Sequence, residues 1–248
     1  MDKVLLITGA SRGIGAATAL LAAKQGYRIC VNYRSDERAA QAVCEEIRQR
    51  GSEAIAVQAD VSHEQEVIEL FSIIDAQWGP ITALVNNAGT VAHKARVDEM
   101  SAARITDILL TNVLAPMICA RQAVLRMSTL HGGGGGSIVN VSSVAARLGS
   151  PAEYVDYAAS KGALDTFTLG LAKEVAAEGI RVNAVRPGYI FTEFHALSGD
   201  PDRVHKLEAG IPMGRGGQAE EVAQAIVWLL SQQASYATGT FIDLGGGR

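Results

Sequence analysis

The fold is decided by one stretch near the N-terminus, Thr8-Gly9-Ala10-Ser11-Arg12-Gly13-Ile14-Gly15. It follows a short apolar run, Val4 to Ile7, and it precedes a helical pattern over 13–25. Glycine permits sharp turns and close backbone approach, and the free N–H groups of a helix N-terminus attract anions. The glycine spacing differs from the common dinucleotide fingerprint G-x-G-x-x-G. A glycine turn between a first strand and a first helix nevertheless predicts a phosphate-binding loop, with a plain turn as the alternative.

Short apolar runs alternate with longer helical patterns on both sides of this turn. Most of the runs are apolar throughout, as strands are when both faces of their sheet are covered. Such alternation predicts an α/β fold with a parallel sheet and helices on both faces. No linker divides the chain, so we expect a single domain over residues 1–248. The expected strands are 3–8, 28–33, 53–58, 81–86, 137–142, 180–186 and 239–243, and the expected helices are 13–25, 36–50, 63–77, 98–128, 153–177 and 218–231.

Composition excludes several classes of protein. The 248 residues carry 22 Lys and Arg against 26 Asp and Glu, and 48% of them are hydrophobic. That hydrophobic share is too high for a disordered chain, and the mild acidity argues against nucleic acid as a partner. The three cysteines are scattered, which supports neither a disulfide framework nor a zinc site. No signal peptide is evident and no stretch approaches the ~20 apolar residues of a membrane helix, so we expect a cytoplasmic protein.

Five motifs in order carry a resemblance that spans essentially the whole chain. The sequence resembles the short-chain dehydrogenase/reductase superfamily, and most of all the branch that contains 3-oxoacyl-carrier-protein reductases and glucose 1-dehydrogenases. The resemblance implies a doubly wound Rossmann-type sheet of seven parallel strands and a nicotinamide cofactor. It also implies hydride transfer between that cofactor and a carbonyl/alcohol pair. The motifs are Thr8–Gly15, Asn86-Asn87-Ala88-Gly89, Ser143 with Tyr157-x-x-x-Lys161, Asn183 through Pro187-Gly188, and Gly239 through Gly246.

Tyr157 and Lys161 are the first candidate catalytic pair. They are four residues apart in a helical pattern, so they share one helix face. A phenol with a reference pKa near ~10 works as an acid–base group at neutral pH only if its anion is stabilised, which a cation one turn away would do. Tyr154 lacks such a cation, because Ala158 lies four residues after it, and we expect Tyr154 at a helix start or at the substrate rim. We therefore expect Tyr157 to exchange the proton and Lys161 to tune it.

Two polar residues complete the expected catalytic set. Ser143 closes the fifth expected strand, where its hydroxyl could bind a carbonyl oxygen and steady the developing alkoxide. Ser142 is the adjacent alternative, and the resemblance favours Ser143. The resemblance also implies that Asn112 holds a water in a proton relay to Lys161, and that Lys161 binds the nicotinamide ribose.

Cofactor choice follows from the residues after the second strand. An Asp or Glu commonly binds the adenosine ribose of NAD there, but this sequence has Tyr33 and then Arg34. Together with Arg12 in the glycine turn, Arg34 suits the 2′-phosphate of NADP. NADP(H) is therefore expected, with NAD(H) as the alternative. The expected cofactor-binding set is Gly9, Ser11, Arg12, Gly13, Ile14, Gly15, Tyr33, Arg34, Asp60, Val61, Asn87, Ala88, Gly89, Tyr157, Lys161, Pro187, Gly188, Ile190 and Thr192.

The segment 189–215 has no firm strand or long helix and is the expected substrate-covering lid. Its residues do not choose between a sugar, an acyl thioester and a small ketone. His195 and His205 lack the further ligands that a metal site needs, so no metal is expected. The helices expected at 98–128 and 153–177 have more apolar positions than one buried stripe requires.

Three functions remain in competition at this point. The first is an NADP-dependent oxidoreductase acting on a small carbonyl or secondary alcohol. The resemblance implies that the helices expected at 98–128 and 153–177 pair into dimers or tetramers, and of these we expect a homo-tetramer. An NAD-dependent sugar or polyol dehydrogenase is the second. A non-catalytic dinucleotide sensor or scaffold is the third, and it would not need the full set of Asn112, Ser143, Tyr157 and Lys161.

Overall fold

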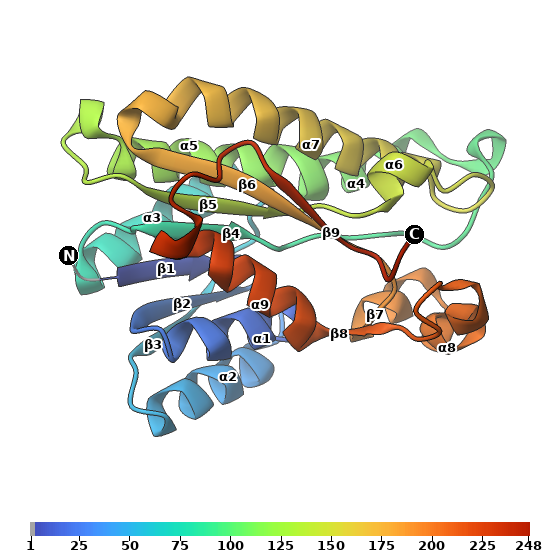
Figure 1. Ribbon diagram of the computed structural model, residues 1–248, viewed down its shortest axis with the longest axis horizontal. Helices are drawn as coiled ribbons and strands as arrows, with labels where there is room; N and C mark the ends of the chain where they lie inside the picture. The colour runs from blue at the N-terminus through green and yellow to red at the C-terminus, as the bar shows by residue number, and fades with distance from the viewer. Residues whose placement is uncertain (1–2) are drawn as a thin grey trace.

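A computed structural model describes residues 3–248 of the chain, apart from the side chain of His195. Its centre is one seven-stranded parallel sheet with the strand order β3-β2-β1-β4-β5-β6-β9 (Figure 1). The crossover after β3 returns the chain to the middle of the sheet, next to β1, and this makes the fold doubly wound. The expected α/β fold class is therefore confirmed. The strands are β1 (Lys3–Ile7), β2 (Tyr27–Tyr33), β3 (Ala54–Gln58), β4 (Ala83–Asn86), β5 (Gly136–Val141), β6 (Ile180–Pro187) and β9 (Phe241–Leu244).

Helices cover both faces of the sheet, and successive side chains of β1 show why. Leu5 and Ile7 face a core formed with α1 (Gly13–Ala23), α2 (Glu37–Gln49) and α9 (Ala219–Leu230). Val4 and Leu6 face the opposite core, which is formed with α3 (Glu64–Trp78), α5 (Ala115–Met127) and α7 (Val155–Val175). Strand side chains alternate between faces, so a strand that is apolar at every position must be covered on both sides. Figure 1 shows α5 and α7 above the sheet and α1, α2 and α9 below it.

The long helix expected over 98–128 has a different construction. It consists of α4 (Ala102–Leu109), a π-helical turn η2 (Leu110–Leu114) and α5, after a short 3-10 turn η1 (Val97–Glu99). Pro116 has no N–H to donate to the carbonyl of Asn112 four residues earlier, which breaks the α-helical ladder there. The N–H of Ala115 instead donates five residues back, to Leu110. This π-turn places Asn112 at the inner side of the helix junction, where it is fully buried.

Within the described chain, one helical span is long and apolar enough to cross a membrane by length and composition alone. It runs from Ala102 to Met127, and half of its most apolar window is buried inside the fold. The sequence pattern did not predict a stretch of this length. Buried core helices of soluble proteins satisfy the same criterion, so this span is weak evidence for a membrane.

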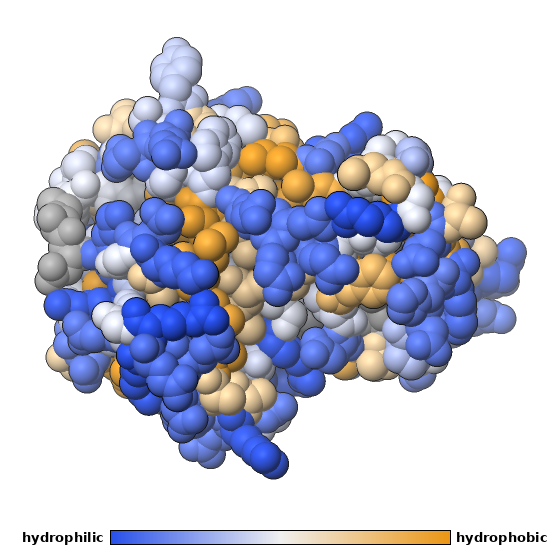
Figure 2. Space-filling view, turned by 60° about the horizontal axis from the view of Figure 1, so that its bottom comes forward, coloured by the Kyte–Doolittle hydropathy of each residue, from blue (hydrophilic) through white to orange (hydrophobic). Residues whose placement is uncertain are grey.

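The expected lid is largely helical. After β6 the chain forms a two-residue strand β7 (Ile190–Phe191), a 3-10 segment η5 (Glu193–Ser198), α8 (Arg203–Leu207) and η6 (Glu208–Gly210). It returns through β8 (Gly217–Gln218), which pairs in parallel with β7. Figure 1 places this unit beyond the carboxyl ends of the strands, beside the C-terminus. Figure 2, with α1 and α2 turned toward the reader, shows a mostly hydrophilic face on which hydrophobic side chains gather in a band across the middle.

Candidate active site

A cavity of about 710 Å³ lies at the carboxyl ends of the parallel strands, between the sheet and the lid. Doubly wound sheets bind ligands at this edge, where the loops after neighbouring strands converge. Two of the residues expected from the sequence, Gly15 and Asn112, do not line this cavity. The expected residues that do line it are Gly9, Ser11, Arg12, Gly13, Ile14, Tyr33, Arg34, Asp60, Val61, Asn87, Ala88, Gly89, Ser143, Tyr157, Lys161, Pro187, Gly188, Ile190 and Thr192.

The glycine turn has the backbone that a phosphate-binding loop needs. Gly9 and Gly13 have φ values of 61° and 56°, in the left-handed region that residues with a Cβ atom rarely adopt. Arg12 is the N-cap of α1 and no side chain caps this helix end. The first N–H groups of α1 therefore keep their capacity to bind an anion beside the cavity.

Gly15 serves packing instead of lining the cavity. A Cβ built on it would lie 2.6 Å from Asn87 Nδ2, 2.8 Å from the Ala10 Cα and 2.9 Å from the Gly9 carbonyl oxygen. Two of these neighbours belong to backbone and cannot move aside cheaply. The third glycine of the turn is thus needed so that α1 can approach the loop closely, as is expected where a helix packs against a phosphate-binding turn.

Replacing Gly15 by Ala should lower the free energy of unfolding by about 1–3 kcal/mol, because the added methyl group overfills the turn. Thermal unfolding should show a melting temperature lower by several degrees. Gly210→Ala is the matched control, because Gly210 has open space around its Cα and no left-handed φ. A Gly15→Ala protein as stable as the Gly210→Ala protein would contradict this account of Gly15.

Asn87 ties the glycine turn to the strand beside it. Its Nδ2 donates to the carbonyl oxygens of Thr8 at 2.9 Å and Gly9 at 3.0 Å. In return, the Thr8 hydroxyl accepts from the backbone N–H groups of Asn87 and Ala88, each at 3.0 Å. These bonds fix the loop after β1 against the loop after β4. Asn87 therefore has the structural role that asparagine at a strand end can fill, and it also lines the cavity.

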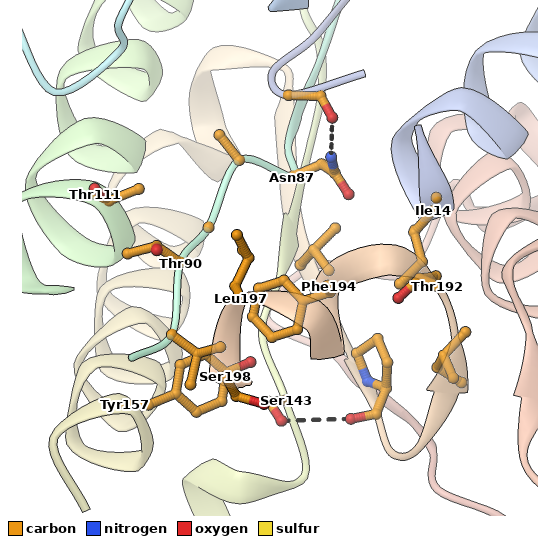
Figure 3. Close-up of a pocket in the computed structure, with 18 of the residues that line it drawn as sticks. Ile14, Asn87, Thr90, Thr111, Ser143, Tyr157, Thr192, Phe194, Leu197 and Ser198 are labelled. Carbon is orange, nitrogen blue, oxygen red and sulfur yellow. Dashed lines mark hydrogen bonds between the residues drawn. The ribbon is translucent and has the colours of Figure 1, made fainter. Parts of the chain in front are cut away.

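Tyr157 and Ser143 meet at one end of the cavity (Figure 3). Burial raises the pKa of Tyr157 to about 12, and the nearby Ser143 hydroxyl offsets part of the rise. The Ser143 hydroxyl accepts from the Ala145 N–H at 3.1 Å and lies 3.5 Å from the Pro187 carbonyl oxygen. The second distance is long for an O–H···O bond, so the serine proton remains available to a ligand.

Lys161 lies beneath Tyr157 on α7 and is only 4% exposed. Its ammonium donates to the Val141 carbonyl at 2.8 Å and lies 5.7 Å from the centre of the Tyr157 ring. Burial lowers the pKa of Lys161 to about 8, while the carboxylate of Asp165 opposes that fall. The sequence argument expected the cation to lower the pKa of Tyr157. In this structure burial of the phenol dominates and raises its pKa, and Ser143 rather than Lys161 is the group that lowers it.

The side chain of Asn112 is hydrogen-bonded to the loop after β4. Its Oδ1 accepts from the Thr90 N–H at 2.8 Å, and its Nδ2 donates to the Thr90 carbonyl at 2.9 Å and to Ser160 Oγ at 3.0 Å. A Cβ built on Gly89 would lie 3.4 Å from Asn112 Oδ1 and 3.5 Å from Lys161 Nζ. Asn112 and Lys161 therefore converge on Gly89 although Asn112 does not line the cavity.

The two adjacent serines at the end of β5 have different partners. Ser142 Oγ donates to Asp165 Oδ1 at 2.6 Å and so is engaged by α7. Ser143 faces Tyr157, as the sequence argument favoured. Alternation along the extended chain explains the split, because neighbouring side chains point to opposite sides.

The other end of the cavity is cationic. Arg12 and Arg34 both line it and both are exposed. Within residues 3–248 neither guanidinium makes an ion pair or a hydrogen bond, so both are free to bind an anion. Tyr33 lines the same end and is 6% exposed. The next carboxylate along the chain, Asp36, caps α2 by accepting from the Ala39 N–H at 3.0 Å.

Asp60 and Val61 follow β3, the edge strand next to β2, and line the cavity at its cationic end. The carboxylate of Asp60 accepts from the Ser62 hydroxyl at 2.7 Å and the Ser62 N–H at 3.0 Å. Partial burial acts to raise the pKa of Asp60, but these bonds together with the nearby charge of Arg34 lower it overall. The carboxylate of Asp60 is thereby bonded to its own loop, and both Asp60 and Val61 line the cavity.

The lid supplies side chains that the sequence argument did not place. Figure 3 shows Phe194 and Leu197, from η5, projecting between Tyr157 and Ser143 on one side and Ile14 and Thr192 on the other. The Phe194 and Tyr157 rings are 6.0 Å apart. These two residues occur in a mixed polar and apolar segment, which gave no periodic signal for their direction.

Four residues form a cationic and aromatic wall of the cavity, and of these the sequence analysis singled out only Tyr154. Arg203 of α8 is 5% exposed and forms an ion pair with Glu153. Its guanidinium lies 5.1 Å from the Tyr154 ring centre and 5.5 Å from that of Tyr189. Tyr154, expected at a helix start or at the substrate rim, is both the N-cap of α7 and a cavity residue. Glu153 and Tyr154 are adjacent, but Tyr189 and Arg203 come from a later segment, so the wall forms only in the folded chain.

No cluster of three or more potential metal ligands occurs within the described part of the chain. His205 of the lid packs its ring against Phe191 at 4.8 Å. The side chain of His195 lies outside the described residues.

Comparison with known proteins agrees with this geometry. The family model described as enoyl-(acyl carrier protein) reductase matches residues 9–248. The chain is 59% identical over 245 residues to the uncharacterized oxidoreductase YgfF of Escherichia coli, with 99% of each chain covered. It is 36% identical over 247 residues to the 3-oxoacyl-[acyl-carrier-protein] reductase FabG of Staphylococcus aureus, with 100% of this chain and 98% of that protein covered.

A solved structure shows the same fold. The crystal structure of a short-chain type dehydrogenase/reductase from Mycobacterium marinum superposes with a TM-score of 0.92 at 34% identity, covering 99% of this chain and 94% of that one. The glycine turn, the strand order and the Ser143, Tyr157 and Lys161 cluster thus occur in a chain that matches such proteins along its whole length. This protein is an oxidoreductase of the short-chain dehydrogenase/reductase family.

Proposed function

We propose that the protein is an NADP(H)-dependent oxidoreductase that interconverts a small carbonyl compound and its secondary alcohol. The observation that carries this proposal is a single cavity with two unpaired arginines at one end and Ser143, Tyr157 and Lys161 at the other. A cavity lined in this way suits an elongated dinucleotide, with its phosphates at the glycine turn. The match to a 3-oxoacyl-[acyl-carrier-protein] reductase supports reduction as the reaction.

The residues present fit a dinucleotide. The uncapped N-terminus of α1 would hold the pyrophosphate, and Arg12 and Arg34 would hold a 2′-phosphate. Tyr33, Asp60 and Val61 would flank the adenosine, and Asn87, Ala88 and Gly89 would continue the floor of the cavity. Pro187, Gly188, Ile190 and Thr192 would face the nicotinamide, whose reduced form supplies the hydride that adds to the carbonyl carbon.

The protein's own groups handle the carbonyl oxygen. Ser143 donates a hydrogen bond to that oxygen, which stabilises the negative charge that develops on it. Tyr157 donates its proton to the same oxygen, and its raised pKa ensures that the proton is present at neutral pH. Lys161, as a buried cation within one helical turn, stabilises the phenolate that remains. Asn112 holds the loop that contains Gly89 in place beside Lys161.

The lid would exclude water from this reaction. Phe194 and Leu197 project into the cavity, and the Arg203–Glu153 ion pair joins the lid to the start of α7. An apolar cover strengthens the electrostatic interactions beneath it. We further propose that residues 1–248 act as one catalytic domain in the cytoplasm.

The decisive experiment is a panel of ketones, 3-oxoacyl thioesters and sugars, each assayed with NADPH and with NADH. Turnover of a carbonyl substrate with NADPH would support the proposal and name the substrate class. Turnover of sugars or polyols with NAD alone would favour the dehydrogenase alternative. Absence of turnover with every pair, together with tight dinucleotide binding, would favour a non-catalytic sensor.

The protein should assemble as a homo-tetramer. Large apolar side chains on α4, η2 and α5, namely Leu109, Leu110, Leu114 and Leu125, are exposed, and so is Leu169 on α7. Light scattering at micromolar concentration should give four times the chain mass of 26.1 kDa. Leu169→Glu should shift this mass downward, because a charge there opposes burial of the patch. A species of only 26.1 kDa in the unmodified protein would refute the assembly.

A further inference from the structure

A buried carboxylate that the reaction scheme does not use ties the strand end carrying Ser143 to α7. Asp165 lies four residues after Lys161 on α7 and is 8% exposed. One of its oxygens accepts from Ser142 Oγ at 2.6 Å, and the other accepts from Arg186 Nε at 2.8 Å. A single side chain thus joins α7 to the end of β5 and to β6.

Ser142, which is bonded to Asp165, lies between Val141 and Ser143, the residues that contact Lys161 and Tyr157. Val141, just before Ser142, accepts from the Lys161 ammonium at 2.8 Å. Ser143, just after it, faces Tyr157. The Ser142 hydroxyl also lies 3.4 Å from the Lys161 backbone carbonyl. Fixing Ser142 therefore fixes the carbonyl that orients Lys161 and the serine that would bind the substrate oxygen.

Asp165 also supplies the charge that a buried lysine needs. From α7, Lys161 faces Tyr157 and Asp165; from η2 it faces Asn112, from the loop after β4 Gly89, and from β5 the Val141 carbonyl. Of these groups Asp165 is the one that carries a carboxylate, and it acts on Lys161 against the effect of burial. Burial disfavours the charged form of a lysine, and a nearby carboxylate favours it. The pKa of Lys161, about 8, reflects both effects.

We propose that Asp165, acting through Ser142, is a positioning residue that holds Lys161 and Ser143 in place and keeps Lys161 cationic at neutral pH. Its effect on turnover rests on the proposed function, since Lys161 matters there by stabilising the Tyr157 phenolate. Its effect on the protonation of Lys161 does not depend on any substrate.

Arg186 gives the proposal a second, opposite test. Its guanidinium holds the outer oxygen of Asp165 and also pairs with Asp243 at 3.3 Å, while stacking 3.9 Å from the Phe241 ring centre. The positive charge of Arg186 offsets part of the stabilisation that the Asp165 carboxylate gives to the charged form of Lys161. Removing Asp165 should therefore make Lys161 easier to deprotonate, and removing Arg186 should make it harder.

The first measurement is an NMR titration of the lysine side chains. The chain has six lysines, and the Lys161 signal is assigned by its loss in Lys161→Arg. Asp165→Asn should lower the pKa of Lys161 by about one unit or more, and Arg186→Gln should raise it. Asp75→Asn is the matched control, because Asp75 also binds an arginine, Arg126, at 2.8 Å but lies on α3, outside the cavity. A Lys161 pKa that is unchanged in both test variants would overturn the proposal.

The second measurement is the pH dependence of kcat for the reduction. In Asp165→Asn the decline at high pH should begin about one unit lower, while kcat near pH 6 should stay within about tenfold of wild type. A uniform loss at every pH would show a merely structural role and would count against the proposal. If no panel substrate turns over, the proposed function fails while the NMR titration still decides this inference. If Asp165→Asn does not fold, Arg186→Gln decides it alone.

Discussion

Replacing Tyr157 by Phe should abolish turnover while leaving NADPH binding nearly intact. The change deletes one oxygen atom and keeps the ring that packs 6.0 Å from Phe194. Because that oxygen carries the proton, kcat should fall by about 10²–10⁴-fold, the range that a positioned general acid contributes. The NADPH dissociation constant, measured by fluorescence titration, should change by less than about threefold.

Tyr236→Phe is the control for this substitution. Tyr236 is fully exposed and does not line the cavity, so the same chemical change there should leave kcat as it is. If Tyr157→Phe kept more than about a tenth of wild-type activity, Tyr157 would not be the proton donor. A loss smaller than tenfold corresponds to less than about 1.4 kcal/mol of transition-state stabilisation.

Cofactor preference should follow the two free arginines at the far end of the cavity. If Arg12 and Arg34 bind the 2′-phosphate, each exposed charged contact contributes about 1–2 kcal/mol. NADPH should then be preferred over NADH by roughly 10- to 1000-fold in kcat/KM. Added salt should weaken NADPH binding more than NADH binding, because only the former includes the extra ionic contact.

Arg34→Asp should erase or reverse this preference. The change removes a cation and places a carboxylate where it can accept from the ribose hydroxyls of NADH. Arg38→Asp makes the same charge change one turn away, at an exposed position that does not line the cavity, and should retain the preference. If wild type uses both cofactors equally, or Arg34→Asp still prefers NADPH, then Arg12 and Arg34 are ordinary surface charges and Tyr33 merely stacks on the adenine.

Where sequence reasoning succeeded, it relied on local patterns with a direct geometric meaning. Continuous apolar runs predicted strands buried on both faces, and all seven expected strands occur within a few residues of their expected bounds. The spacing of Tyr157 and Lys161 predicted one helix face, and both residues line the cavity from α7. Helix and strand periodicity is a property of neighbouring residues, so it can be recognised without knowing the fold.

Sequence reasoning failed where a feature depends on contacts between segments that are far apart in the chain. The position of Gly15 against Asn87 rather than against the cavity depends on how closely the loops after β1 and β4 approach. The raised pKa of Tyr157 depends on burial, which no spacing of residues records. The wall formed by Arg203, Glu153, Tyr154 and Tyr189 joins the lid to the start of α7.

The amino-acid sequence by itself predicted a parallel α/β sheet covered on both faces, a phosphate-binding turn, and Tyr157 with Lys161 as the acid–base pair. Each of these depends on the order of a few neighbouring residues and on the residues that a turn or a helix face requires. Only the tertiary structure decided that Ser143 faces Tyr157 while Ser142 is held by Asp165, and that Asn112 supports the Gly89 loop from outside the cavity. Those outcomes were decided by packing and desolvation, because the direction and the charge of a buried side chain depend on partners from distant strands and helices.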